Sequence, residues 1–363
     1  MRNIEINIGM VCNNRCVFCV NSQVNAAGRR WVSKERVVAE IDRAAARGYR
    51  ALGFLGGEIT YYPHAVEVIR LAREKGFVRI SLCTNGRRLA RKEILDALIE
   101  AGVTRFAVSI HSHEADVEDR ICGRKGAFGE KLAGIDNLVR AAAEGHLRDG
   151  VSLNSCIHGL NWNRLTEMAR FFRARGISDM RFNFLRPEHQ AEGNRELVPR
   201  LSDALREVLR LVVENHRRLR MTITFGDIPV CLWPPSFLAN AAFARRYIGE
   251  FRDLDTDVSE FRDAVVPHRF NWRRTRSATL KARLPVCGAC GAAGICEGPW
   301  TKYVALHGAD EFRAVALAKG AKEAKGAKGR EVRAKGAKDR KGRQEGGSGR
   351  ARARGNAARR KPA

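Results

Sequence analysis

Residues 4–19 read Ile-Glu-Ile-Asn-Ile-Gly-Met-Val-Cys-Asn-Asn-Arg-Cys-Val-Phe-Cys, an alternating run that leads directly into three cysteines. The alternation over residues 4–10 predicts a β-strand. Cys12, Cys16 and Cys19 follow in the spacing C-x3-C-x2-C, which folds three thiolates around one centre within a single loop. Three thiolates suit a [4Fe-4S] cluster with one iron left open. A structural zinc site needs a fourth Cys or His, and none stands close in the sequence.

Short apolar runs and amphipathic stretches alternate from this first strand to about residue 219. Residues 33–47 are helix-like, with Val37 and Ile41 on one face and Ser33 as a candidate N-cap. The same alternation predicts further strands at 51–55, 78–83, 105–110, 151–156 and 180–185, and further helices at 64–75, 92–101, 128–143, 163–175 and 202–216. Six strand–helix units predict an α/β fold with a parallel sheet, either an open doubly wound sheet or a partial or complete barrel. Both architectures place the active site at the C-terminal ends of the strands.

A second group of cysteines stands in the region 220–317, where the regular alternation has ended. Cys287, Cys290 and Cys296 have the spacing C-x2-C-x5-C, with glycines that allow tight wrapping around a metal centre. Cys231 is the best candidate for a fourth ligand. The pattern fits either an iron–sulfur cluster or a zinc ribbon-like knot. We expect residues 220–317 to form a small Cys-rich domain separate from residues 1–219.

The C-terminal segment 318–363 differs in composition from the rest of the chain. It consists almost entirely of Lys, Arg, Ala and Gly, and its 17 basic and 4 acidic residues carry half of the net charge of +26. With so few large apolar residues, the segment is predicted to be disordered. Such a tail is either a solvated extension without a dedicated partner or a non-specific contact for nucleic acid through its phosphates.

Hydropathy argues against a membrane protein. No apolar stretch reaches the length that spans a bilayer, and the first residues lack the apolar run of a signal peptide. We therefore expect a cytoplasmic location and no membrane partner. In that compartment the ten cysteines are expected to be thiols or metal ligands rather than disulfides.

The first cysteine loop resembles the signature of the radical S-adenosylmethionine (SAM) superfamily, C-x3-C-x-aromatic-C after the first strand. The resemblance spans residues 3–219 and implies a partial (β/α)6 TIM-type barrel. It implies that the open iron chelates the amino and carboxylate groups of SAM. An electron from a flavodoxin- or ferredoxin-type donor would then cleave SAM to a 5′-deoxyadenosyl radical, which abstracts hydrogen from a substrate. Phe18 matches the aromatic position that lies beside the adenine.

Other residues match SAM-binding positions of this superfamily. Gly56-Gly57-Glu58 after the second strand is similar to the Gly-Gly-Glu motif that receives the SAM amino group, although Ile59 replaces the usual proline. Alone, such a motif is more often an ordinary turn. The resemblance further implies SAM contacts for residues of the next three strands and the turn after the first of them, namely Thr84, Asn85, Ser109 and Asn154. Asn85-Gly86 also suits a tight turn, and a lone Ser or Asn on a strand is usually structural.

The second cysteine group resembles the auxiliary-cluster extensions called SPASM or Twitch domains. Because only four cysteines are present and none follows Cys296, the shorter Twitch-like form with one auxiliary [4Fe-4S] cluster is implied. Relatives with this layout modify peptides, activate sulfatases or build cofactors, and we expect a peptide rather than a small-molecule substrate. The alternatives are a molybdenum-cofactor cyclase-like enzyme and, from another class, a nucleic-acid-associated protein whose clusters are structural.

Overall fold

The structure is a computed structural model that describes residues 1–20, 30–252, 255–261 and 266–317. The predicted basic tail at 318–363 lies outside the described residues. Residues 1–324 form one compact unit, and the description below concerns this unit alone. The predicted boundary near residue 219 falls inside it.

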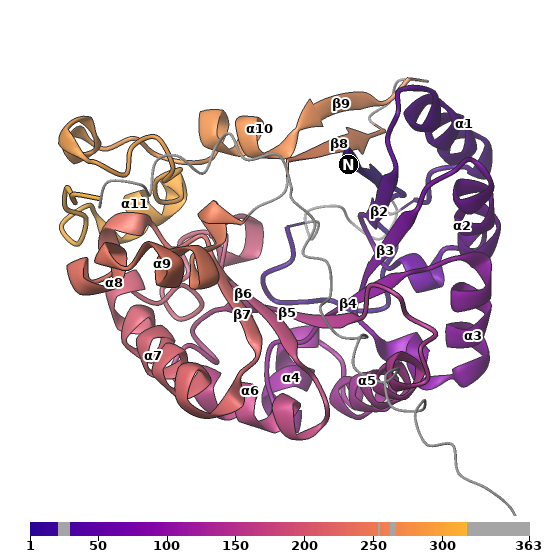
Figure 1. Cartoon of the computed structure of the whole chain (residues 1–363), viewed down its shortest axis with the longest axis horizontal. Helices are drawn as coiled ribbons and strands as arrows, with labels where there is room; N and C mark the ends of the chain where they lie inside the picture. The colour runs from indigo at the N-terminus through magenta and orange to yellow at the C-terminus, as the bar shows by residue number, and fades with distance from the viewer. Residues whose placement is uncertain (21–29, 253–254, 262–265, 318–363) are drawn as a thin grey trace, which may run out of the picture. The chain divides into compact units, whose positions relative to one another are not determined.

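A single curved sheet organises this unit (Figure 1). Its strands run in the order β7-β6-β5-β4-β3-β2-β1-β8-β9. All neighbouring strands pair in parallel except β9, which pairs antiparallel with β8. In chain order the strands are Asn3–Asn7, Ala51–Leu55, Arg79–Thr84, Arg105–Ser109, Val151–Ile157, Asp179–Phe184, Thr222–Gly226, Thr256–Glu260 and His268–Asn271.

Helices connect the parallel strands and cover the outer face of the sheet (Figure 1). The connecting helices are α1 (Lys34–Ala46), α2 (Ala65–Glu74), α3 (Lys92–Ala101), α4 (Ala115–Cys122), α5 (Ala127–Ala143), α6 (Leu165–Ala174) and α7 (Leu201–Glu214). Short helices follow β7, namely α8 (Pro235–Ala239), α9 (Ala241–Tyr247), α10 (Trp272–Thr279) and α11 (Thr301–His307). This is the partial TIM-type barrel that the alternation and the resemblance predict.

The side-chain alternation explains how the sheet acquires two different faces. On β1, Ile4 and Ile6 are fully buried, whereas Glu5 and Asn7 stand on the opposite, inner face. On the covering helices, apolar residues recur at helical spacing, so that Leu201, Leu205 and Val208 of α7 are all buried. Apolar side chains therefore fill the layer between sheet and helices, and polar side chains are left to line the inside of the barrel.

The sheet continues beyond the six predicted strands. β7 extends it next to β6, and β8 pairs with β1 through partners such as Ile4 and Asp257. Two polar contacts also tie the region after β7 to the barrel. Lys281 forms a 2.8 Å ion pair with Asp227, the residue directly after β7, and the hydroxyl of Tyr303 accepts a 2.8 Å hydrogen bond from the amide of Leu201 on α7. The cysteine-rich region is thus joined to the end of the sheet.

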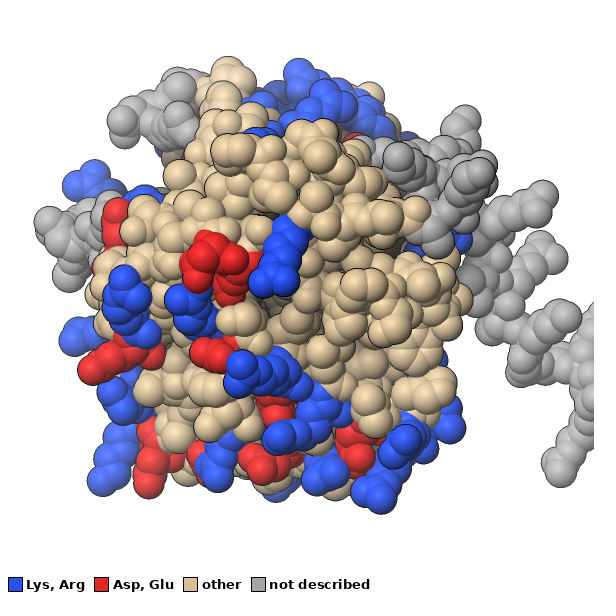
Figure 2. Space-filling view, turned by 90° about the vertical axis from the view of Figure 1, so that its left-hand side faces the viewer, with Lys and Arg blue, Asp and Glu red and all other residues tan. Residues whose placement is uncertain are grey.

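Among the described residues, no helix combines the length and apolar character needed to cross a bilayer. On the side where α7 lies, Lys and Arg side chains are interspersed with Asp and Glu (Figure 2). Arg170 and Glu214 approach to 2.9 Å there, and Arg210 and Glu207 to 3.0 Å. This face therefore carries no continuous basic patch of the kind that nucleic-acid phosphates attract.

Candidate active site and auxiliary cysteine site

The loop with the first three cysteines follows the C-terminal end of β1 and is anchored by backbone hydrogen bonds on both sides. On one side, Gly57 and Glu58 donate amide hydrogen bonds to the carbonyls of Gly9 and Val11, at 2.7 and 2.9 Å. On the other side, the amides that flank Cys16 donate to carbonyls at the end of α4, from Arg15 to Cys122 at 2.8 Å and from Val17 to Ile121 at 3.0 Å. The loop is thereby fixed at the strand ends, where sequence reasoning placed the active site.

The two glycines of the Gly-Gly-Glu motif are required by this packing. A Cβ on Gly57 would lie 1.8 Å from the carbonyl oxygen of Val11, and one on Gly56 would lie 2.1 Å from that of Gly9. Gly56 also has a φ of +111°, which side-chain-bearing residues rarely adopt. The close approach predicted for these glycines is therefore an approach to the backbone of the cysteine loop.

Glu58 connects the ends of β2 and β3. The side chain is 2% exposed, and its Oε1 accepts hydrogen bonds from the amide and hydroxyl of Thr60 and from the hydroxyl of Thr84, at 3.0, 2.7 and 2.6 Å. Among the described residues, its Oε2 accepts one hydrogen bond, from the backbone amide of Asn85 at 2.6 Å. Because a carboxylate oxygen has two lone pairs, Oε2 keeps acceptor capacity for an ammonium group.

Asn85 links β3 to the cysteine loop. Its side-chain nitrogen Nδ2 donates to Oδ1 of Asn13 at 2.7 Å and lies 3.9 Å from the sulfur of Cys12. Arg87, which sequence reasoning missed, adds hydrogen bonds to the carbonyl of Asn13 at 2.7 Å and to Oδ1 of Asn14 at 2.8 Å. No sequence signal pointed to Arg87, because its burial depends on these tertiary contacts.

Phe18 packs against two buried histidines. Its ring lies 5.0 Å from that of His111, edge to face, and 5.2 Å from that of His158. Burial lowers the pKa of His111 to about 4 and that of His158 to about 3. Nδ1 of His111 accepts the amide of Cys156 at 3.1 Å. Both imidazoles are therefore neutral packing partners of Phe18 at ordinary pH.

Ser109 and Asn154 are neighbours, because they pair in register between β4 and β5. The carbonyl of Ser109 accepts a 2.9 Å hydrogen bond from Lys131, and the amide oxygen of Asn154 accepts one of 2.7 Å from Asn183 on β6. Both predicted SAM contacts thus stand side by side on the strand-end side of the barrel.

Glu5, on the inner face of β1, is a buried carboxyl group whose protonation state can be tested. It forms no hydrogen bond or ion pair with another described residue, and burial raises its pKa from 4.5 to about 7. Since the folded state then holds a proton that the unfolded state releases, stability falls as the pH rises from about 4.5 to 7. We expect Glu5→Gln to match the native protein at pH 4 and to exceed its unfolding free energy by about 2–3 kcal/mol at pH 8, measured by urea denaturation.

The control for this prediction is Glu74→Gln, which removes an exposed carboxylate from α2. This variant should show the same difference in unfolding free energy between pH 4 and pH 8 as the native protein. A native-like pH dependence in Glu5→Gln would show that Glu5 is ionised at neutral pH in the folded protein.

The thiols of the first cysteine group are close enough to influence one another. Burial raises the pKa of Cys12, and the charges of Glu58 and Cys19 add to the effect. Cys16 also has a raised pKa, first because of its hydrogen bond with Cys122 and then because of burial. Buried thiols with neighbouring carboxylate and thiol groups need a compensating positive charge to ionise, and iron supplies such a charge. The donor set therefore fits an iron–sulfur cluster with three protein thiolates.

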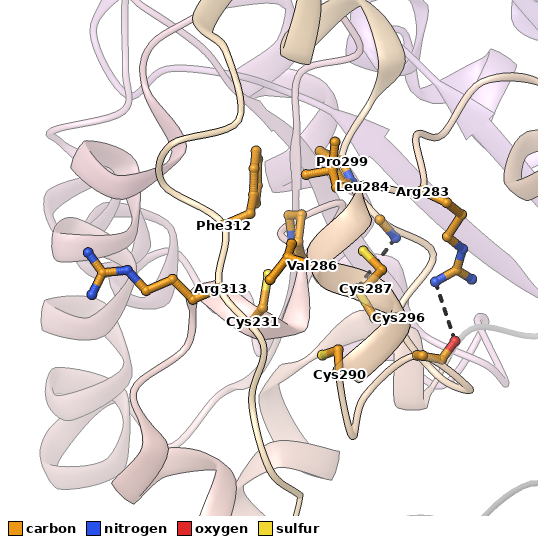
Figure 3. A pocket seen from close by; sticks show the side chains of 13 residues that line it. Cys231, Arg283, Leu284, Val286, Cys287, Cys290, Cys296, Pro299, Phe312 and Arg313 are labelled. Carbon is orange, nitrogen blue, oxygen red and sulfur yellow. Dashed lines mark hydrogen bonds between the residues drawn. The ribbon is translucent and has the colours of Figure 1, made fainter.

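The second cysteine group meets in one cavity (Figure 3). Cys231 comes from the turn Val230–Leu232, Cys287 from the turn Pro285–Ala289, and Cys290 and Cys296 from the residues that follow. The four side chains line one small cavity. Within the described residues, no group of three His, Cys, Asp or Glu side chains stands in a position to hold a single metal ion.

The electrostatics of this cavity fit a metal cluster as well. Burial raises the pKa of Cys231 to about 12, and the neighbouring Cys296, Cys290 and Cys287 contribute in that order. Burial likewise raises the pKa of Cys296 to about 11. The structure thus brings together the four cysteines that sequence reasoning grouped, including Cys231, which is 56 residues before Cys287.

Comparison with known proteins agrees with this geometry. A model of the family described as the radical SAM superfamily matches residues 6–172. A probable GTP 3′,8-cyclase of Thermococcus kodakarensis is 32% identical over 197 residues, which are 52% of this chain and 59% of that protein. The PqqA peptide cyclase of Ruegeria pomeroyi is 29% identical over 219 residues, which are 60% of this chain and 56% of that protein.

The similarity of fold to a solved structure covers more of the chain than the sequence matches do. SuiB of Streptococcus suis, crystallised with S-adenosylmethionine, superposes with a TM-score of 0.56 at 14% identity, over 86% of this chain and 76% of that chain. The sequence matches are shorter, and this chain spans little more than half the length of the two cyclases.

Proposed function

We propose that the chain is an enzyme of the radical SAM superfamily, whose model matches residues 6–172, and that it cleaves SAM at a [4Fe-4S] cluster bound by Cys12, Cys16 and Cys19. The observation that carries the proposal is the convergence of the cysteine loop with Glu58 and Asn85 at the strand ends. When bound, the cluster and SAM together supply reductive cleavage to a 5′-deoxyadenosyl radical, which takes a hydrogen atom from the substrate.

The protein's own residues would hold and orient SAM. Oε2 of Glu58 is free to accept the ammonium group, while Thr84 and Asn85 fix the carboxylate of Glu58 through hydrogen bonds of 2.6 Å each. Phe18, packed against His111, would offer an apolar ring to the adenine. Ser109 and Asn154 add hydrogen-bonding groups for the ribose or carboxylate. The reducing electron would come from a flavodoxin- or ferredoxin-type donor.

The second cysteine group is proposed to hold one auxiliary [4Fe-4S] cluster, in a domain of the SPASM or Twitch type. Four thiols around a single cavity support four protein ligands, with Cys231 as the fourth. A cluster ligated fully by protein serves electron transfer, so it would exchange an electron with the substrate radical.

For the substrate we propose a peptide. One relative matched over 60% of this chain is named as a peptide cyclase, and its match is longer than that of the GTP cyclase. A small-molecule substrate of the kind that the GTP cyclase name describes is the second candidate, since that relative is the more similar of the two in identity.

The experiment that tests this function is anaerobic reconstitution followed by incubation with dithionite and SAM. We expect about seven or eight irons per chain, from two clusters, and release of 5′-deoxyadenosine measured by mass spectrometry. Iron-loaded protein that leaves SAM intact would refute the proposal. Addition of GTP should not change the yield of 5′-deoxyadenosine, whereas a GTP-dependent increase would favour the small-molecule candidate.

A further inference from the structure

Four basic side chains gather on the surface where the cysteine loop meets the end of α4. Arg15 lies in the loop, next to Cys16. Arg120 is in the last turn of α4, and Arg124 and Lys125 follow it in the turn to α5. All four side chains are exposed, and among the described residues none of them forms an ion pair or a side-chain hydrogen bond. Together they form one basic surface at the edge of the loop.

Backbone contacts hold the two parts of this basic surface together. The amide of Arg15 donates a 2.8 Å hydrogen bond to the carbonyl of Cys122, the last residue of α4. A Cβ built on Gly123 would lie 3.2 Å from the Cβ of Arg15. The stem of Arg15 therefore rests beside the turn that carries Arg124 and Lys125. The four charges come from two segments of the chain but occupy one region of the surface.

Local stability accounts for only part of this arrangement. A basic residue in the last turn of a helix is favourable for the helix dipole, and Arg120 is so placed in α4, with Asp116 in the first turn at the other end. The carboxylate of Asp119 stabilises the following turn, because it accepts hydrogen bonds from the amides of Gly126 and Phe128. The other three basic side chains make no comparable contact with the described residues. Local structure thus gives no reason for their charges beside the loop.

The unpaired charges distinguish this surface from the face around α7. On that face Arg170 lies 2.9 Å from Glu214, and Arg210 lies 3.0 Å from Glu207. Basic side chains without ion-pair partners create a positive potential, which steers an acidic partner to its docking position and raises the rate of association. A positive surface beside the loop therefore selects an acidic partner and brings it next to the cysteines.

The position of the basic surface indicates what this partner carries. Arg15 adjoins Cys16, so that their Cα atoms are about 3.8 Å apart, and Cys16 is itself partly exposed. A protein docked here lies next to a proposed ligand of the catalytic cluster, which needs a one-electron donor. A nucleic acid would match the charge but would bring no electron. An acidic flavodoxin meets both requirements, because its flavin lies in the crevice at the carboxyl ends of its strands.

We propose that Arg15, Arg120, Arg124 and Lys125 form the docking surface for an acidic flavodoxin that reduces the cluster of the first cysteine group. The proposal rests on the proposed function, because it needs a cluster that accepts an electron. One electron passes from the reduced flavin to the oxidised cluster, so the flavin is oxidised by one electron and the cluster is reduced by one. The same electron then enters SAM, whose C–S bond breaks to give methionine and the 5′-deoxyadenosyl radical.

The first measurement is binding to reconstituted native protein and to the variant Arg120→Gln/Arg124→Gln/Lys125→Gln. The probe is a recombinant acidic flavodoxin with bound flavin mononucleotide, and its dissociation constant is determined by isothermal titration calorimetry at low and at high salt. We expect the variant to raise the dissociation constant about tenfold at low salt, and the difference to shrink at high salt, because salt screens exposed charges. Native affinity in the variant would overturn the proposal.

The second measurement is the initial rate of 5′-deoxyadenosine formation with two different reductants. With reduced flavodoxin below its saturating concentration, the rate of Arg120→Gln/Arg124→Gln/Lys125→Gln should fall. With dithionite the rate should stay native, because a small reductant needs no docking surface. A fall of the same size with both reductants would contradict the proposal, since the loss would then lie in the site rather than in docking.

The matched control removes three exposed positive charges from α7 and the turn after it. Arg206→Gln/Arg210→Gln/Arg217→Gln changes the net charge by the same amount, and the side chains of Arg206 and Arg210 are 82% and 73% exposed. This control should bind flavodoxin with native affinity. If it weakened binding as much as the basic-surface variant does, total charge rather than position would explain the effect, and the proposal would fail.

Arg15 allows an independent test from the side of the loop. Arg15→Gln removes the positive charge and Arg15→Lys keeps it, while both retain the backbone hydrogen bond to Cys122. We expect flavodoxin to bind less tightly to the glutamine variant than to the lysine variant. Equal affinities would speak against the proposal, because the charge next to Cys16 would then play no part in docking.

The same variants decide between flavodoxin and other acidic partners. If Arg120→Gln/Arg124→Gln/Lys125→Gln lost affinity for a ferredoxin or for duplex RNA but kept native affinity for flavodoxin, the surface would belong to that other partner and the proposal would be overturned. A native protein that takes up iron and binds flavodoxin, yet leaves SAM intact with dithionite, would instead refute the proposed function.

Discussion

Replacement of Cys12 by alanine is expected to abolish the release of 5′-deoxyadenosine from SAM. Only two thiolates would remain in the loop. The 3.9 Å contact between the side-chain nitrogen of Asn85 and the sulfur of Cys12 would be lost as well. The loss should exceed by far the roughly 10–100-fold that removal of an outer-shell partner of a metal ligand costs. The measurement is the initial rate of 5′-deoxyadenosine formation with dithionite, together with iron content, in anaerobically reconstituted protein.

Two cysteines that are not predicted ligands provide the controls. Cys83 lies on β3 and Cys156 on β5, and neither is part of the cysteine loop. Alanine variants of both should keep the native iron content and most of the native rate. If the Cys12→Ala variant released 5′-deoxyadenosine at the native rate, the loop would not be the site of SAM cleavage.

The parts of the fold that repeat locally could be predicted from the sequence. Strand 51–55 and helix 92–101 were predicted with the bounds that the structure has, and helix 33–47 differs from α1 by one residue at each end. In these segments the buried positions follow a period of two or of 3.6 residues, so the pattern itself contains the information.

Elements that depend on distant partners could not be predicted in this way. β8 gains its place by pairing with β1, some 250 residues earlier, as in the pair of Asn3 with Thr256. α4 is absent from the predicted helices, and its eight residues hold only two apolar positions at helical spacing, Val117 and Ile121. Its charged residue Glu118 is buried by contact with Lys131, which the local sequence does not reveal.

The sequence predicted the ligands of the candidate site, but not the residues that hold those ligands in place. The cysteine spacing and the Gly-Gly-Glu motif identified side chains that the structure brings to the same strand ends. The groups that fix them, Arg87 and the pair of Lys131 with Glu118, come from other segments and have no motif. Their positions follow from tertiary packing, because each buried charge must find a partner and the partner can come from anywhere in the chain.

Loss of the second cysteine group is expected to remove about four irons per chain while leaving SAM cleavage in place. Cys287→Ala/Cys290→Ala deletes two of the four thiols around the cavity, and a [4Fe-4S] cluster cannot be held by the remaining pair. The cavity is lined by residues of the region after β7, so the loop at Cys12 should keep its own iron. The measurements are iron and zinc content by mass spectrometry, and the yield of 5′-deoxyadenosine.

The variant Cys231→Ala distinguishes a cluster with four thiolate ligands from a cluster with three thiolate ligands and one open iron. Because Cys231 shares its cavity with the other three thiols and its pKa responds to all of them, the variant is expected to lose the same irons as Cys287→Ala/Cys290→Ala. Full retention of iron in Cys231→Ala would mean that three cysteines suffice, and the open iron would then be free to bind substrate directly. One zinc per native chain that disappears in Cys287→Ala/Cys290→Ala would instead identify a zinc knot, and electron transfer through this site would be ruled out, because zinc has no redox chemistry.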